Sequence, residues 1–99
     1  MFAYRTTWIV KPGCMQKALD LLKAEAERQT ADWVAVRAYT PNISPNALVF
    51  EIVWEHKEAN DEFWPTYWQS PEGQAFSAQW DEVVEKTTGT ELWNMVEWR

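Results

Sequence analysis

Residues 2–26 read FAYRTTWIVKPGCMQKALDLLKAEA, and within this stretch the spacing of the apolar side chains changes once. From Phe2 to Val10 the residues follow the period-2 alternation of a strand, and most of them are aromatic or β-branched. After Lys11-Pro12-Gly13 the apolar residues recur at the i, i+3, i+4 and i+7 positions of an amphipathic helix that runs to about Gln29. The sequence therefore predicts a strand that leads through a turn into a helix.

The middle of the chain predicts a hairpin. Residues 33–40 and 47–55 again read as strands. The loop between them, residues 41–46, contains two prolines and two asparagines, which are turn formers.

Helical spacing returns after Lys57. Residues 58–69 hold four aromatic side chains at helical intervals, although Pro65 is expected to kink or restart the helix. A second helix opens at residues 70–72 and carries the stripe Phe76, Trp80, Val83 and Val84. Gly89 stands where a helix-ending residue belongs, and Glu91 to Trp98 reads as a fourth strand, with Trp93 and Trp98 on opposite faces.

The order β-α-β-β-α-β predicts one ferredoxin-like α+β domain over residues 1–99, a four-stranded antiparallel sheet with helices on one face. The third strand carries apolar residues on both faces, since Leu48, Phe50, Ile52 and Trp54 alternate with Val49 and Val53. The face away from the helices therefore needs a cover. We expect a homodimer in which two copies pack sheet to sheet.

Composition excludes several classes of partner. The net charge of −6 and the dispersed lysines and arginines argue against nucleic acid and anionic membranes, and no apolar run is long enough to span a bilayer. Because there is one cysteine and no basic region before the first strand, we expect a mature cytoplasmic chain without an internal disulfide.

Eight tryptophans are several times the usual number for 99 residues. Strand parity and helical spacing direct many aromatic side chains into the space between sheet and helices, where aromatic walls with a few hydroxyls suit a flat apolar ligand. The alternative is that the same residues fill the core. Trp33 is expected toward the dimer side. The predicted ligand-binding residues are Tyr4, Thr6, Trp8, Phe50, Trp54, Trp64, Trp68 and Trp80.

Charged residues predict a second cluster. Arg5, Arg37 and Glu51 share the parity of the face away from the helices, on three strands of which the third lies between the other two. We expect an arginine–carboxylate–arginine network, which is structural rather than a site for an anion.

Catalytic candidates are few. His56, the single histidine, and Tyr4 are the candidates for a proton acceptor, with an exposed strand-end histidine as the alternative for His56. Cys14 begins the first helix, where a reactive thiol or a small packing residue would fit. One histidine and one cysteine are too sparse for zinc, so we expect no metal site and no cofactor.

Residues 8–13, the following Ala18-Leu19 helix, and Ser70 to Phe76 resemble the dimeric α+β barrel superfamily, which includes antibiotic-biosynthesis-type monooxygenases and NIPSNAP-like proteins. The resemblance implies a homodimer with a pocket between sheet and helices. It further implies either a cofactor-free monooxygenase acting on a phenolic substrate or a non-catalytic structural or interaction module. Thr6 and Ser77 stand where haem-degrading members carry asparagine and histidine, so the resemblance does not extend to haem.

Overall fold

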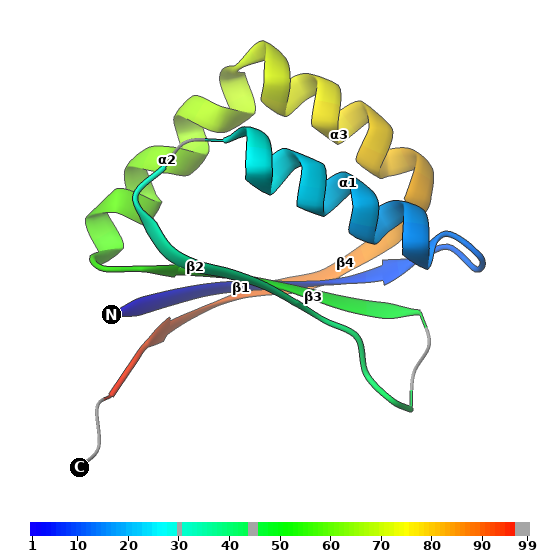
Figure 1. Cartoon of the computed structure of the whole chain (residues 1–99), viewed down its shortest axis with the longest axis horizontal. Helices are drawn as coiled ribbons and strands as arrows, with labels where there is room; N and C mark the ends of the chain where they lie inside the picture. The colour runs from blue at the N-terminus through cyan, green and yellow to red at the C-terminus, as the bar shows by residue number, and fades with distance from the viewer. Residues whose placement is uncertain (30, 44–45, 97–99) are drawn as a thin grey trace.

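The computed structural model describes residues 1–29, 31–43 and 46–96. In chain order the elements are β1 (Phe2–Val10), α1 (Met15–Arg28), β2 (Trp33–Tyr39), β3 (Ala47–Trp54), α2 (Lys57–Gln69), α3 (Pro71–Val83) and β4 (Val84–Asn94) (Figure 1). The order βαββααβ confirms the predicted α+β class, with two consecutive helices, α2 and α3, between the third and fourth strands.

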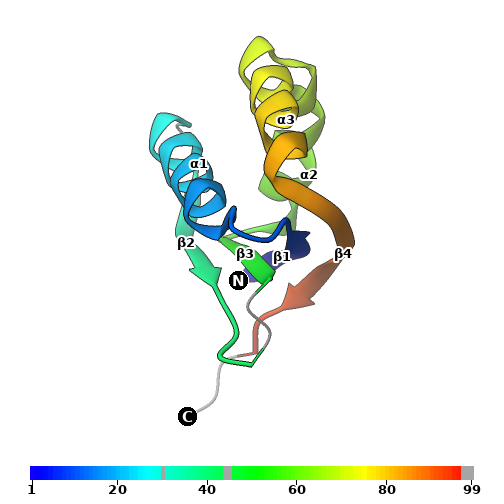
Figure 2. The same ribbon diagram turned by 90° about the vertical axis from the view of Figure 1, so that its right-hand side faces the viewer.

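The four strands form one antiparallel sheet in the order β2-β3-β1-β4, so β3 lies between β1 and β2 as predicted. All three helices lie on the same side of this sheet (Figure 2). In the described part of the chain no helix covers the opposite side, which is called the open face below. Among the same residues no helix is both long and apolar enough to cross a membrane.

The last strand begins earlier than the sequence predicts. Val84 is paired with Val10 and is the first residue of β4, not the end of a helical stripe. Gly89 does not end a helix, because it lies inside β4 opposite Thr7 with a φ of 137°. The register between the two strands shifts next to this pair, and a glycine tolerates the positive φ there. Trp98 lies outside the described residues.

The junction of α2 and α3 is tight. Pro65 lies inside α2, which neither ends nor restarts there. Ser70 caps α3 by accepting a hydrogen bond from the backbone N–H of Gly73 at 3.0 Å, and its hydroxyl donates to the carbonyl oxygen of Tyr67 at 2.6 Å. A side chain at Gly73 would collide with the backbone of Tyr67, so only glycine lets α3 start this close to the end of α2.

The core between sheet and helices consists of two clusters of buried side chains. One surrounds Val10, Leu22 and Leu48, and the other surrounds Ile52 and Trp54. Phe50 packs against both clusters, which places it where they meet.

Trp33 is partly buried and packs against the second cluster, so the expectation that it faces the dimer side is wrong. A register irregularity between Trp33 and Ala35 explains the error. Strict alternation would put Trp33 and Arg37 on the same face. The irregularity instead places Trp33 on the helix side, opposite Trp54. Arg37 stays on the open face, opposite Glu51.

Candidate functional site

A partly open cleft lies between the sheet and the helices at the meeting point of the two core clusters. Its free volume is about 60 Å³, room for roughly two water molecules. Its walls are almost entirely apolar, and it is called the aromatic cleft below. It is lined by Tyr4, Trp8, Leu22, Glu25, Ala26, Gln29, Trp33, Phe50, Ile52, Phe63, Trp64, Tyr67, Trp68 and Phe76.

Five of the eight predicted ligand-binding residues line the aromatic cleft: Tyr4, Trp8, Phe50, Trp64 and Trp68. The ring of Trp64 packs between two other rings of the lining. Its centroid lies 4.6 Å from that of Tyr4 and 5.7 Å from that of Trp68, on which it stacks. The indole N–H of Trp64 donates to the side-chain oxygen of Asn60 at 2.9 Å, which fixes the orientation of the ring.

The other three predicted residues lie outside the lining. The hydroxyl of Thr6, a buried residue, is 3.0 Å from that of Thr90 on β4. Trp54 is buried beneath Trp33 and Phe63, and Trp80 is buried against Trp8.

The two catalytic candidates occupy different environments. Tyr4 lines the aromatic cleft, whereas His56 is exposed at the N-terminal end of α2 and does not line it. Cys14 precedes the first residue of α1 and packs, half-buried, against the core cluster around Val10. Among the described residues, no three His, Cys, Asp or Glu side chains group so as to hold a metal ion.

The aromatic cleft contains a polar group that the sequence pattern did not predict. Glu25 is only 7 % exposed, and the Tyr67 hydroxyl donates a hydrogen bond to one of its carboxylate oxygens. Arg28, one turn further along α1, pairs with the other oxygen. A signal was present, because Glu25 follows Ala18 and Leu22 at i+7 and i+3, on the buried stripe of the helix.

Tyr67 remains a hydrogen-bond donor in this arrangement. Burial, together with the hydrogen bond to Glu25, raises the pKa of the Tyr67 phenol far above its ordinary value. The proton therefore stays on the phenol, which keeps Tyr67 a donor to Glu25.

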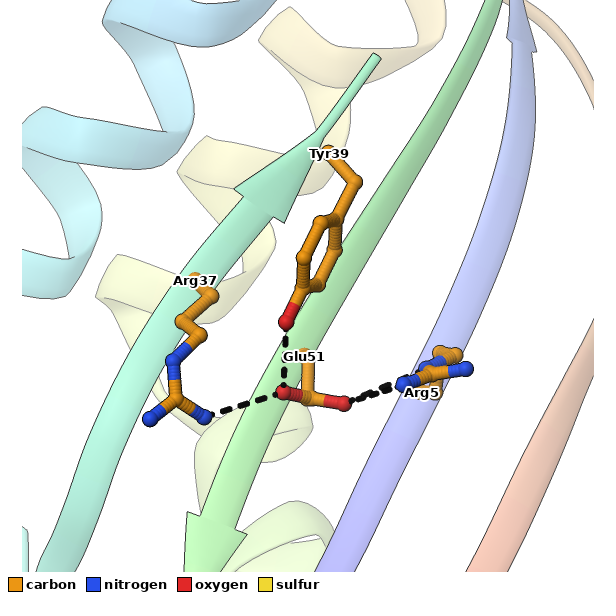
Figure 3. Close-up of polar contacts among 4 residues, drawn as sticks. All are labelled: Arg5, Arg37, Tyr39 and Glu51. Atoms are coloured by element: carbon orange, nitrogen blue, oxygen red, sulfur yellow. Dashed lines mark hydrogen bonds and ion pairs between the residues drawn. The ribbon is translucent and has the colours of Figure 1, made fainter. Parts of the chain in front are cut away.

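A second polar cluster lies on the open face, as the parity of Arg5, Arg37 and Glu51 predicts (Figure 3). Nη2 of Arg5 is 2.6 Å from Oε2 of Glu51, and Nη1 of Arg37 is 3.2 Å from Oε1. Tyr39 completes the cluster, since its hydroxyl donates to Oε1 at 3.0 Å. Burial acts to raise the pKa of Glu51, but the hydrogen bonds from Arg5, Tyr39 and Arg37 outweigh it and hold the pKa below its ordinary value.

Solved structures share this architecture over nearly the whole chain. One described as an antibiotic biosynthesis monooxygenase superposes with a TM-score of 0.73 at 18% sequence identity, covering 98% of this chain and 100% of the other. The chain has the fold of the antibiotic biosynthesis monooxygenase and NIPSNAP structures. An uncharacterized NIPSNAP domain protein from Burkholderia xenovorans matches with a TM-score of 0.76 at 16% identity, covering 97% and 95% of the two chains.

A NIPSNAP family protein from Agrobacterium tumefaciens matches with a TM-score of 0.76 at 13% identity, covering 99% of this chain and 88% of the other. At these identities the similarity shows the fold alone, and at that level it confirms the resemblance drawn from the sequence. No protein-family model and no curated protein sequence matches the chain.

Proposed function

We propose that this protein binds a small aromatic molecule in the aromatic cleft. The observation that carries the proposal is the composition of the walls, in which rings from the sheet and from α2 surround a single buried carboxylate, Glu25. Ligand sites are typically apolar cavities with a few placed polar groups that fix orientation.

The free volume limits the size of the ligand. About 60 Å³ is well below the roughly 150 Å³ of a cavity that binds benzene, so even a single ring requires side chains at the mouth to move. Trp68 is the side chain best placed to move, because it lines the cleft while remaining 46 % exposed.

The chemistry that we propose for this site is oxygenation of a phenol. Molecular oxygen supplies one oxygen atom to the ring and the other leaves as water, while the phenol supplies the electrons and becomes a quinone. One similar structure is described as an antibiotic biosynthesis monooxygenase, which supports this choice among the chemistries that one fold can carry. In this proposal Tyr4, whose ring lies against that of Trp64, orients the substrate.

Two matched variants of α1 test the binding proposal. Ala26 lines the cleft and Ala24 is exposed on the same helix, so Ala26→Trp fills the site whereas Ala24→Trp adds the same bulk to the surface. Binding of p-cresol, followed through the indole N–H resonances, should be lost in Ala26→Trp and kept in Ala24→Trp. Equal binding by both variants would place the ligand elsewhere. Oxygen uptake with phenol as substrate, together with formation of one p-benzoquinone per O2 consumed, tests the reaction separately.

The small free volume favours a second candidate, a non-catalytic homodimeric module whose core is filled by its own side chains. Failure of every single-ring compound to bind the unmodified protein would support this candidate over the first.

Both candidates include a homodimer through the open face. Tyr39 and Trp93 are substantially exposed side chains on this face. Tyr39 is paired with Val49 on β3, and Trp93 is paired with Ala3 on β1. Leu92 provides a matched control, because it is 53 % exposed, close to the 50 % of Trp93, but is paired with Tyr4 on the helix side. In sedimentation equilibrium, Trp93→Glu should dissociate the dimer and Leu92→Glu should not. A monomeric unmodified protein at high concentration would refute the dimer.

A further inference from the structure

Burial of the Glu25 side chain costs free energy. A carboxylate that is 7 % exposed on the apolar stripe of α1 has lost most of its hydration, and a buried charge is tolerated only when it is paired and hydrogen-bonded. Among the residues that line the aromatic cleft it is the sole acidic one.

The carboxylate is held from two sides. Tyr67, on α2, donates to one oxygen, and Arg28 pairs with the other from the more exposed side of α1. Tyr67 is itself fixed, because its backbone carbonyl accepts hydrogen bonds from the N–H and the hydroxyl of Ser70 at 3.0 and 2.6 Å. The orientation of Glu25 is therefore set before any ligand arrives.

These two partners do not use the full acceptor capacity of Glu25. Two carboxylate oxygens offer about four lone-pair sites, and Tyr67 and Arg28 occupy one on each oxygen. The surface of the aromatic cleft is almost entirely apolar, so a ligand reaches the remaining sites only when a lining side chain moves, and a hydrogen bond to a charged group is stronger there than in water.

Charge decides which donor suits this acceptor. The guanidinium of Arg28 already balances the carboxylate, so the cluster is neutral as it stands. A neutral hydroxyl on the ligand keeps the cluster neutral, whereas an ammonium group would leave an uncompensated positive charge in an apolar site.

We propose that Glu25 is the acceptor that recognises a phenolic hydroxyl, so that the aromatic cleft selects phenols over aromatic rings without a hydrogen-bond donor. This inference rests on the proposed ligand binding and names the residue that distinguishes a phenol from other single rings. Tyr67 acts through Glu25 as a positioning residue.

Three ligands of similar size test the selectivity on the unmodified protein: p-cresol, 4-methylanisole and toluene. The first has a donor, the second has the same oxygen without a hydrogen, and the third has neither. We expect p-cresol to bind about tenfold or more tightly than 4-methylanisole, the size of effect expected for a hydrogen bond to a charged group. Equal affinities for the two would overturn the role of Glu25 and leave the cleft as a binding site.

Variants then assign the effect to one residue. Glu25→Gln should reduce the ratio of the p-cresol and 4-methylanisole affinities about tenfold. Glu27→Gln, at an exposed position two residues further on, should leave the ratio unchanged. Tyr67→Phe should lower the ratio by a smaller factor without abolishing toluene binding. If Glu25→Gln does not fold, the comparison of ligands on the unmodified protein decides alone. If none of the three ligands binds, the proposed function and this inference both fail.

Discussion

Gly73→Ala isolates the contact that sets the distance between α2 and α3. A Cβ atom at Gly73 would lie 2.9 Å from the carbonyl carbon of Tyr67 and closer still to its oxygen. Both atoms belong to the backbone, so a rotamer change cannot relieve the collision, and the end of α2 must move relative to α3.

Two effects of opposite sign determine how much Gly73→Ala changes the free energy of unfolding. Alanine has a better helix propensity than glycine, worth about 1 kcal/mol in a helix interior. Overpacking costs about 1–3 kcal/mol and more when the backbone must shift. Since this collision is with the backbone, we place it at the upper end, which leaves a net loss of about 2 kcal/mol in the free energy of unfolding.

Urea unfolding of Gly73→Ala measures this loss, and Ala75→Gly provides the control. Ala75 is exposed on the same helix, so its replacement reports propensity without a collision. Because Tyr67 moves with the end of α2, Gly73→Ala should also weaken p-cresol binding. A Gly73→Ala protein as stable as the unmodified one would show that helix propensity outweighs the collision with Tyr67.

Three further substitutions test the open face and β4. Glu51→Gln should remove part of the pH dependence of stability. The pKa of Glu51 is lower in the folded state than in the unfolded state. The ionised Glu51 side chain therefore stabilises the fold above the ordinary carboxyl pKa, and this stabilisation is lost as the pH falls through the pKa of the folded state. Urea unfolding at neutral and acidic pH should show a loss of about 1–2 kcal/mol at pH 7 that disappears in acid, given that both arginines are partly exposed. Tyr39→Phe should cost about 1 kcal/mol in urea unfolding at pH 7, and an unaltered midpoint would show that the hydroxyl contributes nothing. Gly89→Ala should cost about 1–3 kcal/mol in thermal unfolding, because alanine is strained at a φ of 137°, and no loss would mean that β4 relaxes around it.

Local pattern determined much of the architecture. The alternation of β1 and β3 placed Trp8 and Phe50 on the helix side, and the same parity brought Arg5 to Glu51 across neighbouring strands. These predictions succeeded because side-chain direction in a regular strand depends only on the position of a residue in the sequence.

Tertiary structure decided the rest. The irregularity in β2 reversed the face of Trp33, and pairing with β1 made Val84 a strand residue where helical spacing continued. The burial of Glu25 likewise depends on Tyr67, 42 residues away on another helix. The order and faces of the regular elements therefore follow from local sequence pattern. The polar centre of the aromatic cleft arose only from packing, because the partner that allows a carboxylate to be buried is supplied by a distant part of the chain.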